Sequence, residues 1–390
     1  MATLSEALKK INKRYETAVI SNEVKTVSSY GTLSLGSPSL DFILYNSFPE
    51  GKIIEFCGKE SSGKTTASFF VAASYQRRER VRHPDNPRGI LYVDLERTAD
   101  KNWAKLSGYD MDADDVKTWY FTPNDSPAEV VLSDVIDIVK TGEIGFVIID
   151  SLNMLVPQQV FNDNLEKKEM GGIAKVLGDF VRRITPILSE NFCTLIGIQQ
   201  GRDNVTGYGN PFTTSGGNAW KAGCSVRLMI KRGAPFDEDG TELKSSAENP
   251  AGYVMEVAVL KTKVCKWDRR LGRMHINYNS GVDTIQDTIE VATFFGLIDN
   301  STQGTFKIVD LDTGEIAVDE NGDEVKIRGK KNIKPYFLEH PTQFKKLYDK
   351  TYEILSRKDD PNVVSFERLL NVNIAETFGM TAESFEQEMN

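Results

Sequence analysis

The sequence is poor in cysteine and histidine, and it contains no long hydrophobic run. Its four cysteines, at positions 57, 193, 224 and 265, lack C-x-x-C spacing, which indicates neither a disulfide framework nor a zinc site. With three histidines in 390 residues, we do not expect a catalytic histidine. No apolar run approaches the roughly 20 residues that cross a bilayer, and the amino terminus lacks the layout of a signal peptide. We therefore predict a cytoplasmic protein with no membrane partner.

The composition is that of a globular chain with an acidic balance. Hydrophobic residues make up 40% of the 390 residues, which is enough for a large core and for two or three domains. The formal net charge of −9 argues against an overall electrostatic grip on nucleic acid. A nucleic-acid path needs only a local basic surface, so the total charge leaves that class of partner open.

The most informative segment is the motif GKESSGKT at residues 58–65, between an apolar strand and an amphipathic helix. In this pattern glycines let backbone N–H groups surround a phosphate, and the helix that follows adds partial positive charge. Lys64 would reach the β- and γ-phosphates, and Thr65 would offer its hydroxyl to Mg²⁺. The flanking strand and helix argue against a chance glycine–serine turn. The nucleotide-binding residues predicted here are Gly58, Glu60, Ser61, Ser62, Gly63, Lys64, Thr65 and Thr66.

Two more apolar strands end in carboxylates. Residues 146–150 read FVIID, so Asp150 would emerge at the carboxyl edge of a sheet and hold Mg²⁺, directly or through water. Residues 91–96 read LYVDLE, and Glu96 is the candidate that activates or orients water for ATP hydrolysis. The pattern alone is also that of a solvated glutamate that opens the next helix and complements its dipole.

Short β-rich runs alternate with helical patterns between about residues 50 and 285, which predicts βαβ units on a largely parallel sheet with antiparallel last strands. The expected strands are 53–56, 90–94, 146–150, 194–199, 226–231 and 254–261. Within the helical pattern at 180–190, Pro186 is expected to kink or restart the helix.

The two ends of the chain differ from this core. Residues 4–15 have the apolar spacing of an amphipathic helix, whose stripe needs a partner. After about residue 286 we expect a smaller α+β unit, with a hairpin at 310–324 and a helix at 337–355. The predicted division is a docking helix and linker at 1–30, an ATPase core at 31–285 and a carboxy-terminal domain at 286–390.

Four signatures follow one another along the chain. Residues 58–66 read GKESSGKTT, 93–100 read VDLERTAD, 146–151 read FVIIDS and 209–219 read GNPFTTSGGNA. On these motifs the chain closely resembles the RecA recombinase family over nearly its full length. The resemblance implies an α/β fold: a P-loop ATPase core with a mainly parallel sheet flanked by helices, an amino-terminal polymerisation helix and a small α+β carboxy-terminal domain.

The resemblance also implies roles at the nucleotide site. Glu96 would be the activating glutamate, and Gln200 would sense the γ-phosphate and pass its presence to the following loop. Asp100 and Trp103 would flank the adenine. The family usually has tyrosine where Trp103 stands, and tryptophan can stack on adenine equally well.

Three residues would act across a subunit interface by the same resemblance. Tyr278 would cover the adenine of a neighbouring subunit, and Lys261 and Lys263 would approach its γ-phosphate. Two cations supplied in this way could act as an arginine finger does, so that hydrolysis depends on filament assembly. The sequence alone equally allows these lysines to be a solvated, protected strand edge.

DNA would follow two loops, at 157–171 and 201–212. The residues implied to contact it are Met170, Arg182, Arg202, Gly216, Gly217 and Asn218. Two departures from the family pattern occur here: Gly178 stands where the family has a phosphate-binding serine, and the second loop is one residue short. Phosphate contacts carry no sequence information, so the predicted binding is independent of DNA sequence.

The stretch 326–346 is basic and contains aromatic residues, which favours a duplex-DNA surface on the carboxy-terminal domain. The alternative is a solvated basic face. After residue 368 four glutamates occur without Lys or Arg, as in the family's acidic tails, but apolar residues there leave autoinhibition doubtful.

The function implied by the resemblance is a strand-exchange recombinase. ATP would bind between subunits, and a homo-oligomeric helical filament would form on single-stranded DNA and pair it with duplex DNA. One alternative is a RecA-fold DNA motor of the helicase or branch-migration class, which would form closed rings; the sequence shows none of the accessory domains such motors carry. Another is a non-hydrolysing, ATP-gated recombination mediator, which the presence of Glu96 and the two lysines argues against.

Overall fold

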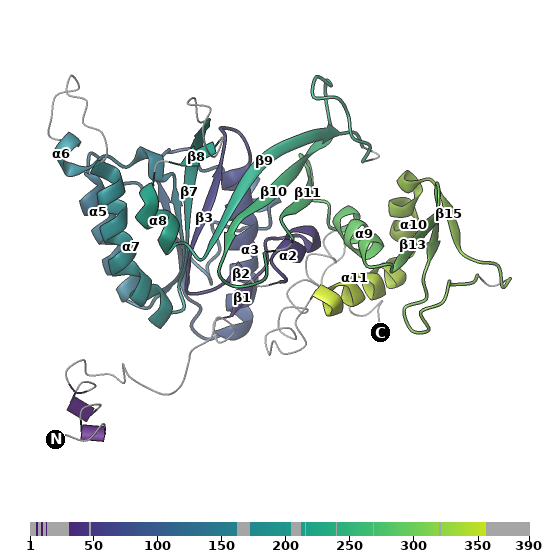
Figure 1. The fold of residues 1–390 in the computed structure, drawn as a ribbon, viewed down its shortest axis with the longest axis horizontal. Helices are drawn as coiled ribbons and strands as arrows, with labels where there is room; N and C mark the ends of the chain where they lie inside the picture. The colour runs from purple at the N-terminus through teal and green to yellow at the C-terminus, as the bar shows by residue number, and fades with distance from the viewer. Residues whose placement is uncertain are drawn as a thin grey trace.

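The structure is a computed structural model in which a large body built on a central sheet lies beside a smaller body (Figure 1). The residues it describes are 5–6, 9–10, 13, 31–46, 48–161, 172–203, 212–214, 216–238, 240–267, 269–319 and 321–355. Those described between 5 and 13 are helical, and the remainder of the helix predicted at 4–15 lies outside the described residues. Within the described ranges, no helix is both long and apolar enough to cross a membrane.

The central sheet has ten strands, most of them parallel. Its order is β12 (Gly281–Val282), β11 (Leu271–Asn277), β10 (Gly252–Thr262), β9 (Val226–Phe236), β3 (Ile53–Gly58), β7 (Thr194–Asp203), β6 (Ile144–Asp150), β4 (Gly89–Asp94) and β5 (Thr118–Phe121), with β8 (Phe212–Thr214) paired to β7. The strands from β9 to β5 are parallel, whereas β10, β11 and β12 are antiparallel. The predicted α/β class is confirmed. The sequence pattern did not reveal β5, a four-residue edge strand with a largely exposed surface.

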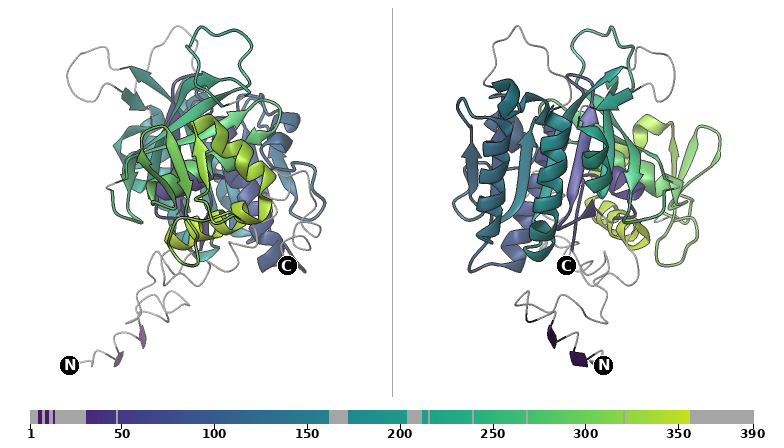
Figure 2. Two further views of the ribbon diagram at one scale, coloured as in Figure 1. Left: turned by 90° about the vertical axis from the view of Figure 1, so that its right-hand side faces the viewer. Right: turned by 60° about the vertical axis from the view of Figure 1, so that its left-hand side comes forward.

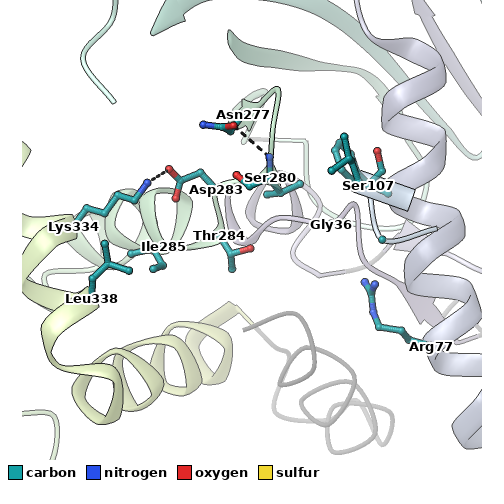
Figure 3. A pocket seen from close by; sticks show the side chains of 14 residues that line it. Gly36, Arg77, Ser107, Asn277, Ser280, Asp283, Thr284, Ile285, Lys334 and Leu338 are labelled. Atoms are coloured by element: carbon teal, nitrogen blue, oxygen red, sulfur yellow. Dashed lines mark hydrogen bonds and ion pairs between the residues drawn. The ribbon is translucent and has the colours of Figure 1, made fainter. Parts of the chain in front are cut away.

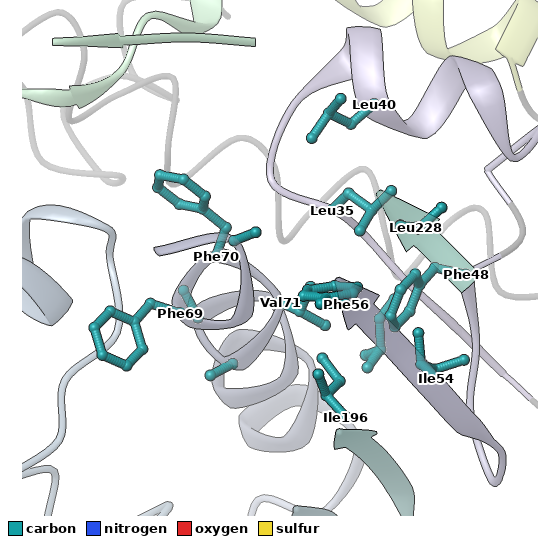
Figure 4. Packing of buried hydrophobic residues seen from close by; sticks show 14 of the residues in the cluster. Leu35, Leu40, Phe48, Ile54, Phe56, Phe69, Phe70, Val71, Ile196 and Leu228 are labelled. Atoms are coloured by element: carbon teal, nitrogen blue, oxygen red, sulfur yellow. The ribbon is translucent and has the colours of Figure 1, made fainter. Parts of the chain in front are cut away.

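Helices cover both faces of this sheet (Figure 2). One core packs α3 (Lys64–Arg82) and α2 (Pro38–Ile43) against strand residues such as Ile54 and Phe56, as Figure 4 shows. The other packs α5 (Ala128–Lys140) and α7 (Gly172–Glu190) against residues of the opposite parity, such as Ile53. Alternate residues of a strand point to opposite faces, so a strand covered on both sides must be apolar throughout. Each fully buried large apolar side chain contributes roughly 1.5–3 kcal/mol.

Several short elements connect these layers. They are β1 (Thr32–Leu33), β2 (Phe48–Pro49), α4 (Lys101–Leu106), the 3₁₀ turn at Leu152–Met154, α6 (Gln158–Phe161) and α8 (Gly217–Gly223). In α8, Trp220 is fully buried in the same core as α5 and α7. At Gly178 of α7, an added Cβ would lie 3.1 Å from the Cβ of Ala219 in α8, a tight contact that would require a small shift of one helix. Glycine at 178 therefore allows close packing of α7 on α8.

The smaller body has its own hydrophobic core. Its elements are α9 (Thr284–Phe294), β13 (Ile298–Thr302), β14 (Thr305–Ile308), β15 (Lys326–Arg328), the 3₁₀ turn at Lys330–Asn332, α10 (Ile333–Glu339) and α11 (Pro341–Leu355). Buried hydrogen bonds join it to the large body. Among them, Ser37 donates to Asp287 at 2.5 Å, and Tyr352 donates to Asp41 at 3.1 Å. A cavity of about 330 Å³ lies between the bodies, beside the ion pair of Lys334 with Asp283 (Figure 3).

Three local predictions differ from the structure. Helix α7 continues through Pro186 without a restart, and the alternative, a kink at this residue, stays a prediction. Proline has no N–H to donate to the carbonyl oxygen four residues before it. Both Pro186 and that residue, Arg182, lie on the exposed side of the helix, where water can donate to the carbonyl instead. The helix predicted at 337–355 is two helices that meet at His340, and the predicted hairpin at 310–324 contains isolated bridges instead of regular strands.

Candidate nucleotide-binding and DNA-binding sites

The glycine-rich motif forms the turn between β3 and α3, as its sequence context predicts. Gly63 is the residue before the helix and has a φ of 93°, in the left-handed region that favours glycine. An added Cβ would also lie 2.7 Å from Cε of Met255 in β10, but that atom ends a flexible side chain, so the backbone conformation is the main reason for glycine. The first N–H groups of α3 point into the loop because they have no partner within the helix. The ammonium group of Lys64 donates to the carbonyl oxygen of Lys59 at 2.6 Å, and its burial lowers the pKa.

The predicted magnesium residues lie in contact with each other. The hydroxyl of Thr65 donates to Oδ2 of Asp150 at 2.6 Å, and the hydroxyl of Tyr92 donates to the same oxygen at 3.2 Å. Burial raises the pKa of Asp150 to about 6, and the nearby carboxylate of Glu96 adds to the rise, while both hydrogen bonds oppose it. A cation at this position would offset the cost of burying the carboxylate, so the residues fit Mg²⁺.

A divalent cation here would share its coordination with phosphate oxygens. Among the described residues there is no group of three or more His, Cys, Asp or Glu side chains that could hold a metal ion by themselves. Mg²⁺ commonly takes one or two protein oxygens together with substrate phosphates and water, so a single carboxylate and one hydroxyl are a sufficient protein contribution.

The catalytic candidates Glu96 and Gln200 lie close together. Glu96 follows β4 and Gln200 is in β7, with β6 between these two strands. The hydroxyl of Ser151 donates to Oε1 of Glu96, and the side-chain amide of Gln200 donates to the same atom at 3.4 Å. The backbone N–H of Gln200 donates to Oδ1 of Asn153 at 2.6 Å. Sequence reasoning missed Ser151 and Asn153. Ser151 directly follows Asp150 and Asn153 comes two residues later, just after the end of a buried strand. This position was the signal that could have revealed them.

The wall for a nucleotide base is built around Trp103 of α4. Its indole N–H donates to the hydroxyl of Thr66 at 2.9 Å, which fixes the ring beside the phosphate loop. Asp100 caps α4: its carboxylate accepts from the backbone N–H groups of Asn102 at 2.9 Å and Trp103 at 3.1 Å. The structure therefore gives Asp100 a local task besides the adenine contact that the resemblance implied.

These groups surround one cleft with a volume of about 540 Å³. Its lining residues are Glu60, Ser61, Ser62, Gly63, Lys64, Thr65, Thr66, Glu96, Trp103, Asp150, Gln200, Arg232, Tyr253 and Tyr278. Gly58 lies at the end of β3, just before the loop. The sequence did not indicate Arg232 or Tyr253, because neither belongs to a motif.

Tyr278 lines the cleft of its own chain, whereas the resemblance implied that it covers the adenine of a neighbouring subunit. The turn from β11 to β12 returns to the same sheet edge, and the N–H of Tyr278 donates to the carbonyl of Ala251 at 3.0 Å. Gly281 closes this turn with a φ of 78°, and a Cβ there would overlap the carbonyl oxygen of Leu106 at the end of α4. The turn and α4 are thus packed together, and both face one cleft.

Lys261 and Lys263 lie at the opposite end of the sheet. Lys261 pairs in register with Arg227 at the start of β9, level with the beginning of β3, so about 13 Å of strand separates it from the phosphate loop. Its ammonium group donates to the carbonyl oxygens of Lys221 at 2.6 Å and Ala222 at 2.9 Å, and Lys263 donates to Ala222 at 2.8 Å. The lysines therefore bind the carboxyl end of α8, where cations are favoured, and are not a freely solvated edge.

The residues implied for DNA binding are described only in part. Met170 and most of the two loops, 162–171 and 204–211, lie outside the described residues. The backbone of Arg202 is in β7, paired with β8. On α7, Arg182 is exposed and forms an ion pair with Asp179. The N–H of Gly216 donates to Oε1 of Gln199 at 3.3 Å, so it is not a free phosphate donor in this conformation.

Gly217 and Asn218 open helix α8 immediately after the second loop. Gly217 has a φ of 71°, and Asn218 is exposed. Both lie at the same end of the sheet as Gln200, because β7 carries Gln200 toward the loop and α8 leaves it. The nucleotide cleft and the described residues before and after the second loop therefore lie at the same end of the sheet.

The basic stretch at 326–346 is not an unbalanced cationic face. Five of its lysines form ion pairs with acidic residues, and all five partners lie outside the stretch. These pairs are Lys326 with Glu324 (2.9 Å), Lys330 with Glu290 (3.2 Å), Lys334 with Asp283, Lys345 with Asp349 (3.0 Å) and Lys346 with Asp312 (3.2 Å). The fold supplies neighbours that the linear count did not include, which weakens the argument for duplex DNA at this surface.

Comparison with known proteins gives one consistent result. The model of the RecA N-terminal domain matches residues 2–283. The chain is 32% identical over 268 residues to Protein RecA of Chloroherpeton thalassium, covering 68% of this chain and 69% of that protein. It is 28% identical over 377 residues to Protein RecA of Lactobacillus delbrueckii subsp. bulgaricus (94% and 92%) and 28% identical over 369 residues to Protein RecA of Aquifex pyrophilus (93% and 95%).

Proposed function

This chain belongs to the RecA family, and on that premise we propose how its own residues carry out the ATP-dependent recombination reaction of that family. The protein is a DNA-dependent ATPase of the recombinase class. The family uses ATP, binds DNA and forms filaments; the finer points, which are the roles of single residues, Mg²⁺, a helical filament on single-stranded DNA and pairing with duplex DNA, are our proposals. A cytoplasmic location stays a prediction.

One observation carries the mechanism: the ends of β3, β4, β6 and β7 bring Lys64, Asp150, Glu96 and Gln200 into a single cleft. Lys64 and the loop N–H groups bind the phosphates, while Thr65 and Asp150 hold Mg²⁺. Mg²⁺ bound there supplies positive charge that offsets the charge developing on phosphate oxygens.

Glu96 orients the attacking water. Its Oε1 already accepts from Ser151 and from Gln200 at 3.4 Å, which fixes the direction of the carboxylate. A γ-phosphate in the cleft competes for the amide of Gln200, because the hydrogen bond to Glu96 is long at 3.4 Å and an anionic phosphate oxygen at a shorter distance is a stronger acceptor. Gln200 therefore links the state of the nucleotide to β7 and the loop that follows it.

The second loop is also anchored to the strand that leads into the phosphate loop. Glu55 of β3 is fully buried, and its carboxylate accepts from Thr214 at 3.3 Å and from the indole of Trp220 at 3.2 Å. Arg227 completes this cluster with an ion pair to Glu55. A buried charge of this kind holds its partners firmly, since loss of one partner leaves an uncompensated carboxylate. We propose that DNA at the second loop acts on the cleft through this cluster and through Gln200.

The lysine pair completes the active site of a neighbouring subunit. Lys261 and Lys263 are too far along the sheet to reach their own cleft, and they lie at its opposite end. A head-to-tail contact that places this end against the cleft of the next protomer supplies two cations to the phosphates. Repeated head-to-tail contacts that do not close give a helical filament.

The test measures the ATPase rate with and without single-stranded DNA and images the same mixtures by electron microscopy. We expect stimulation by DNA and filaments, with both the stimulated rate and ATP binding lost in Lys64→Ala. Equal rates with and without DNA would contradict the mechanism. Closed rings with nucleotide-driven unwinding would support the motor alternative, and filaments that bind ATP without turnover would support a mediator.

A further inference from the structure

Arg232 is one of the residues that line the nucleotide cleft. Its guanidinium carbon is 4.2 Å from the ring centroid of Tyr253 and 5.8 Å from that of Tyr278, and it donates a hydrogen bond to the hydroxyl of Tyr278. The two tyrosine rings are 5.9 Å apart and tilted by 38°. A planar cation thus covers a pair of aromatic rings inside the cleft.

The strand register explains why this arginine points into the cleft. Arg232 in β9 is directly opposite Met255 in β10, and directly opposed residues share one face of a sheet. Met255 and Tyr253 face the phosphate loop, since both approach Gly63. Just after Arg232 the register shifts between Tyr253 and Met255, which marks a β-bulge. Bulges near active sites commonly re-aim a side chain.

Thr66 ties the aromatic side chains of the cleft to the phosphate loop. The hydroxyl of Thr66 accepts from Trp103 at 2.9 Å and also bonds the hydroxyl of Tyr253. Thr66 directly follows Lys64 and Thr65, so the hydroxyl end of Tyr253 lies at the loop. Arg232 lies over the ring of this tyrosine. Its guanidinium is therefore placed among the aromatic groups of the cleft, which are the groups that can stack on a base.

We propose that Arg232 binds the base end of the nucleotide in its own subunit, as a cationic cover over an aromatic slot formed by Trp103, Tyr253 and Tyr278. The inference rests on the nucleotide cleft proposed above. A guanidinium can stack on a base and donate in its plane, which an ammonium group cannot do. The residue raises affinity for a nucleoside triphosphate and takes no part in phosphoryl transfer.

The experiment compares two ligands in the absence of DNA. Binding of a slowly hydrolysed ATP analogue with Mg²⁺ is measured by calorimetry, and binding of inorganic tripolyphosphate is measured in the same way. Variants are Arg232→Ala, Arg232→Lys and the matched control Arg80→Ala, which removes an exposed arginine paired with Asp115 outside the cleft. We expect Arg232→Ala to bind the ATP analogue roughly tenfold more weakly, with tripolyphosphate binding unchanged. Arg232→Lys should lose most of the same affinity, and Arg80→Ala should bind as the wild type does.

Three results would overturn the inference, and each differs from failure of the proposed function. Unchanged affinity of Arg232→Ala for the ATP analogue would remove Arg232 from the site. An equal loss for tripolyphosphate would make it a phosphate contact. A defect seen only when single-stranded DNA is added would make it a DNA contact. If the wild type itself binds no nucleotide, the proposed function fails instead. As a further check, KM for ATP should rise in Arg232→Ala while kcat at saturating ATP stays the same.

Discussion

Replacement of Asp150 by asparagine distinguishes two effects of this carboxylate: the free energy that its burial costs the fold, and its role in the reaction. The side chain is 2% exposed, and burial raises its pKa from 3.8 to about 6 in the folded protein. Because the folded state holds the proton more tightly than the unfolded state, ionisation above pH 4 destabilises the fold. The loss of stability begins at a pH near the pKa of Asp150 in the unfolded state and is complete above its pKa in the folded state. Asparagine titrates in neither state and avoids this loss.

The size of the effect follows from the two pKa values. At 1.36 kcal/mol per pKa unit, a difference of about two units costs about 3 kcal/mol at pH 8. At pH 5 the carboxyl group is still largely protonated in the folded state, and the same relation gives about 1.6 kcal/mol. Between pH 5 and pH 8 the asparagine variant should therefore gain about 1.4 kcal/mol relative to the wild type. The substitution also alters the hydrogen bonds to Thr65 and Tyr92. This change shifts the stability difference by the same amount at pH 5 and at pH 8, so it cancels when the two pH values are compared.

The assay is urea unfolding of wild type and Asp150→Asn at both pH values, with a chelator present and nucleotide absent. The free energy of unfolding of Asp150→Asn should increase relative to that of the wild type as the pH rises from 5 to 8. A second arm adds ATP analogue and Mg²⁺ at pH 8, which should stabilise the wild type more than the variant, because the variant lacks the carboxylate that holds the cation. A stability difference that is the same at both pH values would refute the reasoning, whatever the activity of the variant.

Three further predictions concern turnover and assembly. Glu96→Gln should leave ATP binding and filament formation intact and lower kcat by at least about 100-fold, measured by single-turnover hydrolysis; normal turnover would remove Glu96 from its role. Mixtures of Lys261→Ala with Lys64→Ala should recover part of the DNA-stimulated ATPase at mixed interfaces, and no recovery at any ratio would argue against lysines in trans. Gly281→Ala should raise KM for ATP several-fold and lower stability by about 1–3 kcal/mol, because the new Cβ forces the turn away from Leu106; unchanged KM and melting temperature would count against the packing described.

The sequence predicted the phosphate end of the site well because that end is built locally. A phosphate loop is one continuous segment whose backbone binds the ligand, so its chemistry can be read in Gly63, Lys64 and Thr65. Asp150 and Glu96 were also found, because apolar strands that end in carboxylates deliver them to one edge of a parallel sheet. The order of signatures along the chain then identified the family, which the comparisons confirm.

The base end was predicted less well because it is assembled from distant strands. Tyr278, Tyr253 and Arg232 come from β9, β10 and the β11–β12 turn, and their meeting depends on strand register and one bulge. A shift of one residue would move each side chain to the other face of the sheet. The resemblance implied that Tyr278 acts on a neighbour. Its place in the cleft of its own chain depends on how the antiparallel strands return, which the sequence pattern does not specify.

Charge and helix continuity were also decided by neighbours in space. The basic run at 326–346 looked unopposed along the chain, yet acidic residues from α9 and the 310–324 loop pair with its lysines. Pro186 looked like a break, yet it falls on the exposed side of α7. By itself the sequence determined the fold class, the phosphate loop and the carboxylates at its edge, because local backbone geometry and strand polarity fix them. Only the tertiary structure decided which rings and cations face the cleft, because that depends on register between strands far apart in the chain.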